Sequence, residues 1–141
     1  MRFISLIIVS LAWALFGTLS ASAAIEARID TKAQKMQVLV DGVQTYEWRV
    51  STARKGYVTP KGDYRPQDMY KKYYSHKYHN SPMPYAIFYN GGYAVHGTNA
   101  VASLGRPASH GCIRLDTENA ATLYSLVTQH GKANTHIVIV R

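Results

Sequence analysis

The sequence predicts a mainly β domain with one well-defined helix. Three observations lead to this fold class. Apolar residues alternate with polar ones in short segments, Asp-Gly and Asn-Gly-Gly turns separate two pairs of these segments, and one later segment has helical spacing with a start and a stop signal. No internal repeat or Pro/Gly/Ser linker divides residues 24–141, so we expect one domain there after a short leader.

The first strands follow from alternation and from one tight turn. Apolar residues alternate with polar ones over 25–29 and again over 36–40. Asp41-Gly42 then supplies a hairpin turn into a third strand that ends near Val50. The apolar positions in these segments are Ile25, Ala27, Ile29, Met36, Val38, Val40, Val43, Tyr46, Trp48 and Val50.

Later strands are shorter or more apolar. Thr59–Tyr64, TPKGDY, reads as a turn into a short strand, and Asn90–Gly92 joins the segments 86–88 and 93–96 as a second hairpin. The final segment, THIVIV, has the β-branched composition of a buried strand. Between them, Arg65–Tyr85 is basic, aperiodic and contains five tyrosines, which favours a binding loop or lid over a disordered basic loop.

One helix is expected directly after the segment that contains the cysteine. Asp116 or Thr117 can cap its N-terminus, and Gly131 can end it. Ala120, Leu123, Tyr124 and Val127 fall on one face at helical spacing.

Residues 1–23 are typical of a signal peptide. Arg2 precedes an apolar run, and Ala21-Ser22-Ala23 has the small-residue pattern of a cleavage site, so we expect cleavage after Ala23. The alternative is an uncleaved membrane anchor, because the apolar run approaches the length of a membrane span. Export of the domain 24–141 to the periplasm is the expectation, with no membrane span left after removal of the leader.

The net charge of the chain indicates which kinds of binding partner to expect. The formal net charge is +8, and +7 without Arg2. A basic exported protein is expected to meet the cell wall or an acidic envelope surface rather than nucleic acid. The sequence does not determine the oligomeric state.

Cys112 is the only cysteine, so it cannot form an internal disulfide. It follows Gly111 at an expected sharp turn, near a helix N-terminus and among Arg106, His110 and Arg114, a setting that lowers a thiol pKa. We therefore expect a nucleophilic thiol; the alternative is a buried, inert cysteine.

His96 is the best-placed base for this thiol. It ends an apolar strand before Gly97, whereas His110 is only two residues from Cys112. Cys112, His96 and His110 could instead be metal ligands, but they lack the closely spaced pairs of a zinc site.

Val95–Leu115, VHGTNAVASLGRPASHGCIRL, closely resembles the signature of YkuD-type L,D-transpeptidase catalytic domains, with its His-Gly element and its Ser-His-Gly-Cys element. The resemblance extends through TPKGDY, MPYAIFY and the helix. It implies a YkuD-like β-sandwich in which the cysteine turn leads into the helix, and it implies no metal or other cofactor.

The resemblance also implies roles for single residues. Cys112 would be the nucleophile, and His96 its base, oriented by the carbonyl of Gly97 rather than by a carboxylate. Amides of Gly111 and Cys112, with His110 close by, would form the oxyanion hole. Arg114 would hold a substrate carboxylate unless it only pairs with Asp116, and Ser109 would fix the turn. Substrate binding is assigned to Arg114, Ser109, Thr98 and Tyr85.

The implied activity is transfer of peptidoglycan stem peptides through a thioester on Cys112, which forms 3→3 cross-links or attaches an envelope protein. Two alternatives stay open. One is an L,D-carboxypeptidase or amidase that uses the same Cys112 and His96, and the other is a wall-binding module without catalysis.

Overall fold

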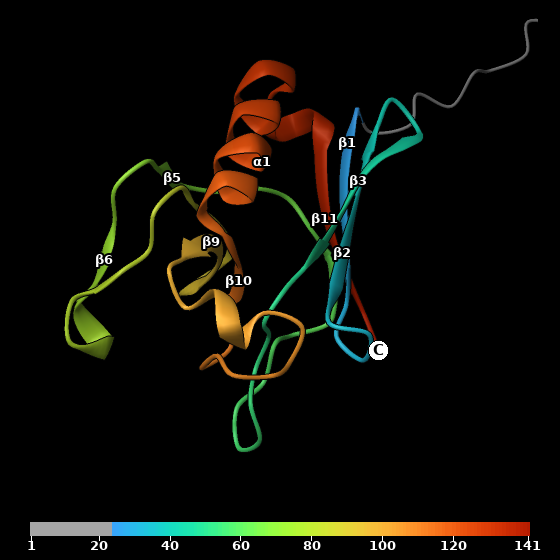
Figure 1. The fold of residues 1–141 in the computed structure, drawn as a ribbon. Coiled ribbons are helices and arrows are strands. Elements are labelled where there is room, and N and C mark those ends of the chain that lie inside the picture. Colours follow the sequence, from blue (N-terminus) through green and yellow to red (C-terminus); the bar gives the residue numbers. More distant parts are fainter. Residues whose placement is uncertain (1–23) are drawn as a thin grey trace, which may run out of the picture.

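The computed structural model describes residues 24–141 (Figure 1). The expected leader, 1–23, lies outside the described residues. Within the described part of the chain, no helix is both long enough and apolar enough to cross a membrane.

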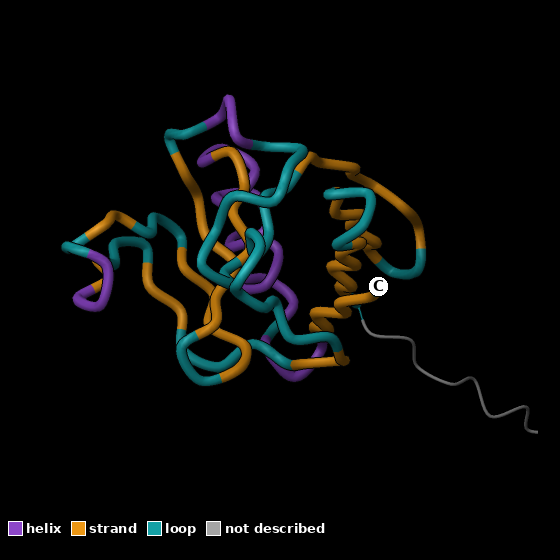
Figure 2. Tube along the Cα trace, turned by 90° about the horizontal axis from the view of Figure 1, so that it is seen from below, coloured by secondary structure: helices purple, strands orange, loops and turns teal. Residues whose placement is uncertain are grey.

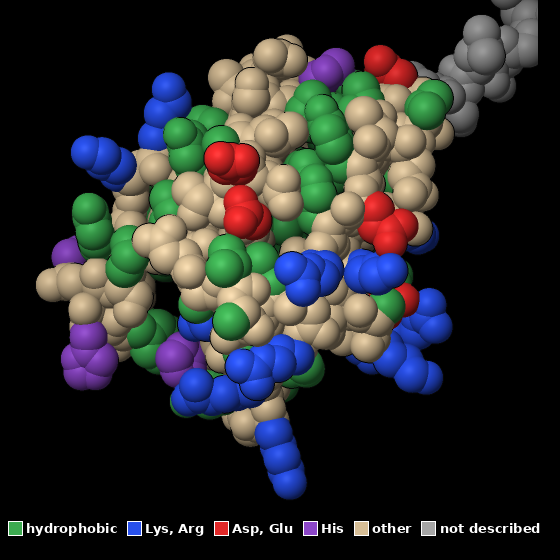
Figure 3. All heavy atoms as spheres, viewed as in Figure 1, with side chains coloured by type: hydrophobic (Ala, Val, Ile, Leu, Met, Phe, Trp, Pro, Cys, Tyr) green, Lys and Arg blue, Asp and Glu red, His purple; other side chains and the backbone are tan. Residues whose placement is uncertain are grey.

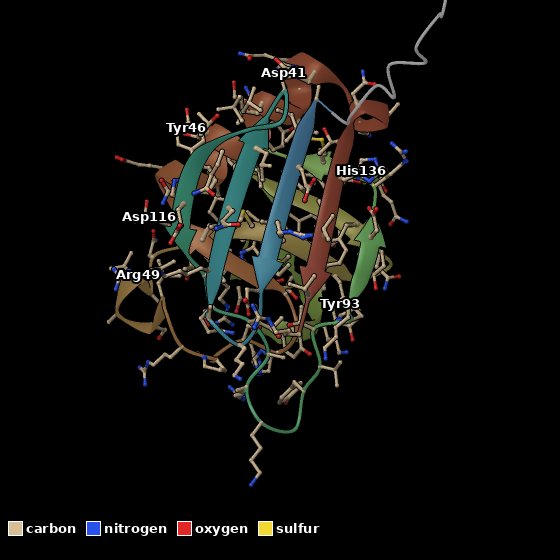
Figure 4. All side chains as sticks on the ribbon, turned by 90° about the vertical axis from the view of Figure 1, so that its right-hand side faces the viewer. Asp41, Tyr46, Arg49, Tyr93, Asp116 and His136 are labelled. Carbon is tan, nitrogen blue, oxygen red and sulfur yellow. The ribbon has the colours of Figure 1, made fainter. Side chains whose placement is uncertain are left out.

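The larger sheet has five strands in the order β3-β2-β1-β11-β4. Three of the four neighbouring pairs are antiparallel, but β1 and β11 pair parallel, with Ile25 opposite Thr135. The first and last strands of the described chain thus lie side by side, as Figure 4 shows face-on. The strands are β1 (Ile25–Asp30), β2 (Lys35–Val40), β3 (Val43–Arg49), β4 (Gly62–Tyr64) and β11 (Thr135–Val140).

The second sheet carries the segments around the cysteine. Its order is β10-β9-β8-β5, and β9 and β10 pair parallel while the other neighbours are antiparallel. The expected turn at Asn90–Gly92 joins β8 to β9 as a hairpin. The strands are β5 (Met69–Tyr70), β8 (Ala86–Asn90), β9 (Tyr93–Thr98) and β10 (Ile113–Asp116).

One α-helix, α1 (Thr117–His130), occurs in the described residues. The carboxylate of Asp116 accepts a hydrogen bond from the Glu118 amide at 3.0 Å, as an N-cap should. Gly131 ends the helix with φ +92°, and Ala120, Leu123 and Val127 are buried as expected. The helix therefore begins where it was expected. The four residues of β10 lie between the cysteine turn and this start, and Ile113 and Leu115 alternate into the core as a strand.

The core lies between the two sheets and α1. It unites apolar side chains of β1, β2 and β11 with those of β8, β9, β10 and the helix. Apolar residues of the edge strand β3 are less covered, and Val43 is 66% exposed. The predicted fold class, a mainly β domain with one helix, is confirmed.

Arg65–Tyr85 contains more structure than an aperiodic loop. Besides β5, it forms a hairpin of β6 (Tyr74–Ser75) and β7 (Ser81–Pro82), with the 3-10 turn η1 (His76–Tyr78) at its tip. The hairpin extends to one side of the body in both ribbon and tube views (Figures 1 and 2). Two further 3-10 helices, η2 (Val101–Ser103) and η3 (Lys132–Asn134), and two isolated bridges, of Ser51 with Arg114 and of Ala53 with Ser109, complete the described chain.

Candidate active site

The parallel pairing of β9 and β10 brings the two expected catalytic residues together. His96 lies opposite Arg114, and Val95 lies opposite Ile113. Because side chains alternate along a strand, the burial of Ile113 in the core places Cys112 and Arg114 on the opposite face. His96 shares that face, since Val95 beside it points into the core. Cys112, His96 and Arg114 therefore occupy one face of the second sheet.

Ser109 holds the cysteine turn closed. Its buried hydroxyl donates to the Cys112 carbonyl oxygen at 2.6 Å and accepts from the Gly111 amide at 3.0 Å. The expected hydrogen bonding of Ser109 within the turn is thus present. The Gly111 amide is occupied by it, so the expected oxyanion donor at Gly111 is wrong. The Cys112 amide has no hydrogen-bond partner within residues 24–141.

The cysteine turn is also hydrogen-bonded to the segment that follows β3. The hydroxyl of Thr59 donates to the Gly111 carbonyl oxygen at 2.8 Å and accepts from the Ala53 amide at 3.0 Å. Backbone bonds join Ser109 to Thr52 and Arg54. These hydrogen bonds from residues 51–59, which are not part of the cysteine turn, therefore fix its position.

Glycine is required at position 111 for two reasons. Its φ is +132°, in the region that favours glycine, and an added Cβ would lie 2.7 Å from Tyr93 Cε1 and 2.9 Å from the Val58 carbonyl oxygen. The carbonyl belongs to the backbone and cannot turn aside. The turn can therefore approach its neighbours this closely only without a side chain.

Cys112 lies in a partly apolar environment. It packs against the buried cluster of Met83, Ala86 and Ala94, and its Sγ is 3.8 Å from the Gly92 carbonyl oxygen. Burial raises the pKa of the Cys112 thiol, and the hydrogen bond from the Ala94 backbone and the charge of Arg114 only partly oppose this. The sequence-based expectation of a lowered thiol pKa is therefore wrong, because β10 separates the thiol from the helix N-terminus and the apolar cluster covers it.

His96 is 6% exposed and its Nδ1 lies 2.7 Å from the Gly97 carbonyl oxygen. This is the contact that the resemblance implies. Burial lowers the pKa of His96 to about 4, against the opposing effect of the Gly97 contact. The ring is therefore neutral at pH 7. Since a carbonyl can only accept, Nδ1 carries the proton and Nε2 keeps a free lone pair.

Gly97 is packed where a side chain would not fit. An added Cβ would lie 2.9 Å from the Thr117 Cα and 3.1 Å from Pro84 Cγ. Its amide donates to the Pro84 carbonyl oxygen at 2.8 Å. Gly97 therefore lets the strand that carries His96 pass close to the start of α1.

His110 takes part in a cluster that the sequence did not reveal. The Tyr78 ring stacks on it at a centroid distance of 4.1 Å and an interplanar angle of 6°, and Tyr57 meets its edge at 4.9 Å. Arg54 Nη2 is 3.1 Å from His110 Nε2. These partners come from segments more than 30 residues away in the chain, and only their basic and aromatic composition signalled them.

Arg114 is half-buried on the face that also carries His96 and Cys112. Burial, with the nearby charge of Arg54, lowers its pKa, while the proximity of Cys112 raises it. The alternative of an ion pair with Asp116 is not seen among the described residues, where the Asp116 carboxylate caps α1. Its guanidinium thus keeps its capacity to bind an anion.

Two residues that were expected to bind substrate, Tyr85 and Thr98, make contacts within the protein. The partly buried Tyr85 ring packs against the core and meets Tyr124 of α1 at a centroid distance of 5.7 Å, and its assignment to substrate binding stays a prediction. Thr98 ends β9, and its hydroxyl accepts from the Ala100 amide at 3.1 Å. Ser109 likewise uses its hydroxyl inside the turn. Of the substrate-binding set, Arg114 alone presents a charged group with no ion-pair partner within residues 24–141.

Metal binding finds no support in this geometry. Within residues 24–141, no three His, Cys, Asp or Glu side chains gather in an arrangement that could hold a metal ion.

Comparisons with known proteins identify a family for this chain. The family model of the YkuD L,D-transpeptidase catalytic domain matches residues 25–139. Among curated proteins, the chain is 48% identical over 46 residues to the probable L,D-transpeptidase YcfS of Escherichia coli (strain K12), which covers 33% of this chain and 14% of that protein.

Solved structures share the fold at lower identity. An L,D-transpeptidase from Mycobacterium smegmatis superimposes with a TM-score of 0.74 at 22% identity, over 84% of this chain and 59% of that one. The L,D-transpeptidase LdtMt1 in complex with imipenem gives the same TM-score at 21% identity, over 83% and 59%. The chain thus spans less than two thirds of these relatives. Since the family model covers nearly the whole described domain, the chain belongs to the family of YkuD L,D-transpeptidase catalytic domains.

Proposed function

We propose that the protein is a periplasmic L,D-transpeptidase that acts on peptidoglycan stem peptides through a thioester on Cys112. The observation that carries this proposal is the placement of Cys112 and His96 on one sheet face, with His96 Nδ1 held 2.7 Å from the Gly97 carbonyl oxygen. A nucleophile beside a base whose tautomer is fixed by a third group is the arrangement that acyl transfer needs.

The protonation states favour a proton transfer that accompanies attack. The pKa of Cys112 is raised and that of His96 is about 4, so both groups are neutral at pH 7. His96 Nε2 takes the thiol proton as Sγ bonds to the carbonyl carbon of the third stem residue. The bond to the terminal D-Ala then breaks, and His96 returns the proton to the departing amine. A thioester on Cys112 remains.

The tetrahedral intermediate needs donors for its oxyanion. The amide of Cys112 has no partner within the described residues, whereas Ser109 occupies that of Gly111. The Cys112 amide is therefore the backbone donor in this proposal. Such a donor contributes about 3 kcal/mol to the transition state.

The acceptor determines the product. An amine of a neighbouring stem gives a 3→3 cross-link, and a lysine of an envelope protein gives an anchored protein. In each case the amine attacks the thioester carbonyl, His96 takes its proton, and the thiol is restored. Transfer to water, giving an L,D-carboxypeptidase or an amidase, is the second candidate and uses the same Cys112 and His96.

The hairpin β6–β7 supports a role as a cover for the donor peptide. Tyr73 and Met83 from this segment belong with Cys112 to one apolar cluster, and Tyr78 stacks on His110. A cover over the thioester would keep water from it and favour amine acceptors. A wall-binding module without catalysis would need neither the thiol nor the base.

Product analysis tests this proposal. Purified protein is incubated with disaccharide tetrapeptides, and the products are separated by mass. A transpeptidase gives cross-linked dimers, whereas tripeptide monomers alone would favour the hydrolase. The absence of both products, together with binding to the muropeptides, would favour the binding module.

A further inference from the structure

Three side chains with free donors surround His110 at the edge of the cysteine turn. Arg54 contributes from the segment after β3, and Lys77 and Tyr78 contribute from η1 at the tip of the β6–β7 hairpin. We call Arg54, Tyr57, Lys77, Tyr78 and His110 the His110 cluster. His110 precedes Cys112 by two residues, so the cluster adjoins the nucleophile.

Aromatic contacts hold the cluster together. His110 is fixed between the face of Tyr78 and the edge of Tyr57, with ring centroids 4.1 and 4.9 Å away. The Arg54 guanidinium lies 5.0 Å from the Tyr57 ring centroid, and Lys77 Nζ lies 5.4 Å from that of Tyr78. Both cations therefore lie against ring faces, which leaves the Lys77 ammonium and the Arg54 N–H groups that do not contact His110 for another ligand.

The contact between Arg54 and His110 determines which ring nitrogen donates. An arginine can only donate, so His110 Nε2 must accept at 3.1 Å and Nδ1 carries the proton. Burial and the charges of Arg54, Arg114 and Lys77 lower the pKa of His110, which keeps the ring neutral in this tautomer. Its Nδ1–H has no partner within the described residues.

The cluster lacks counter-charges. Among the ion pairs of residues 24–141, none involves Arg54, Lys77 or Arg114. The sequence has no Asp or Glu between Tyr70 and Leu115 that could supply one. Figure 3 shows many Lys and Arg side chains in the lower half of the visible face and others at its upper left, with most acidic side chains above the lower group. Cations gathered without an acidic partner favour an anionic ligand.

We propose that Arg54, Lys77 and His110 form a second carboxylate-binding subsite beside Arg114, which takes a free carboxylate of the acyl-donor peptide. The identity of that peptide as a stem peptide rests on the proposed function. An arginine fork matches a planar carboxylate, and the Lys77 ammonium and the His110 Nδ1–H add single donors. Because the hairpin carries Lys77, a bound carboxylate would also tie the hairpin to the cysteine turn.

Binding to the Cys112→Ala protein tests the subsite without any reaction. Two tetrapeptide donors are compared by calorimetry at fixed ionic strength. They differ only in whether the residue before the acylated one carries a free carboxylate or a carboxamide. We expect the free-carboxylate donor to bind about tenfold more tightly, as one charge-assisted contact allows. Arg54→Gln should abolish most of this difference in affinity. Lys77→Gln, which changes the cation contributed by the hairpin, should do the same.

Lys55→Gln is the matched control, because Lys55 is an exposed neighbour of Arg54 that lies outside the cluster and its loss changes the net charge equally. It should preserve the tenfold preference. Equal affinities for the two donors, no binding of either, or equal losses in Arg54→Gln and Lys55→Gln would overturn the subsite.

Acylation of the unchanged protein, followed in parallel by intact mass, separates this inference from the proposed function. A carboxylate preference in binding without acylation of Cys112 would support the subsite and contradict the reaction. Acylation without any preference would support the reaction and contradict the subsite.

Discussion

His96 and Arg114 lie opposite each other in the parallel pairing of β9 and β10. This register places the base of the proposed reaction beside the arginine proposed to hold a substrate carboxylate. Cys112, two residues before Arg114, projects from the same face. A slip of the pairing by one residue would turn His96 away from Cys112, so the register itself is part of the site.

The buried His96 should make the fold sensitive to acid. Its pKa is about 4 in the folded protein against an ordinary 6.5, so between these values the unfolded chain binds the extra proton. Stability is complete above pH 6.5 and falls as the pH drops towards 4, by about 3 kcal/mol for this group. Urea unfolding at several pH values measures the slope. In His96→Gln, the part of the pH dependence of unfolding free energy that His96 contributes should disappear. An unchanged slope would mean that burial does not hold His96 neutral.

The thiol of Cys112 should react slowly with a simple alkylating agent. Because burial raises its pKa, little thiolate exists at pH 7, and the rate with iodoacetamide should still be rising above pH 9. We expect a lower rate at pH 7 than for the same cysteine in urea, where the ordinary pKa returns and the thiol is exposed. A rate plateau reached below pH 8 would instead indicate a preformed thiolate.

Loss of the Ser109 hydroxyl should loosen the cysteine turn. Ser109→Ala removes the bond to the Cys112 carbonyl and leaves the Gly111 amide unpaired in a buried place. The expected cost is about 2 kcal/mol in the free energy of unfolding, with slower acylation of Cys112. Ser125→Ala, on the exposed face of α1, is the control and should change little. Equal stability of the two variants would contradict the role of Ser109 in the turn.

A methyl group at position 111 should be far costlier than one at position 56. Both glycines have positive φ, but the added Cβ meets Tyr93 and the Val58 carbonyl at 111 and nothing within 4 Å at 56. We expect Gly56→Ala to cost about 1 kcal/mol and Gly111→Ala about 3 kcal/mol, measured by thermal or urea unfolding. Similar costs would show that the turn can move away from its neighbours.

Local signals explain which parts of the fold were predictable. The turns at Asp41-Gly42 and Asn90–Gly92 and the helix from Asp116 to Gly131 depend on residues close in sequence, and all three are confirmed. The pairing of β1 with β11 joins segments more than 100 residues apart, and no local pattern specifies it. The strand β10 was not predicted, because its four residues are too few for an alternating pattern to identify a strand.

The site also has parts that local sequence predicts and parts that depend on tertiary packing. The motif around Cys112 and His96 can be recognised in the sequence, and so can the serine that hydrogen-bonds within the turn. The raised thiol pKa is not, because it depends on Met83, Ala86 and Ala94 covering the thiol from other strands. The Gly111 amide was misassigned for a similar reason, since only the folded turn shows it bonded to Ser109. Arg54 and Tyr78 reach His110 only through tertiary packing.

The most direct test of the proposed reaction is the intact mass of the protein during exposure to a tetrapeptide donor. The protein should gain an adduct equal to the donor without its terminal D-Ala, located on Cys112 by peptide mapping and absent in Cys112→Ala. Turnover by Cys112→Ala, or an adduct on another residue, would contradict it.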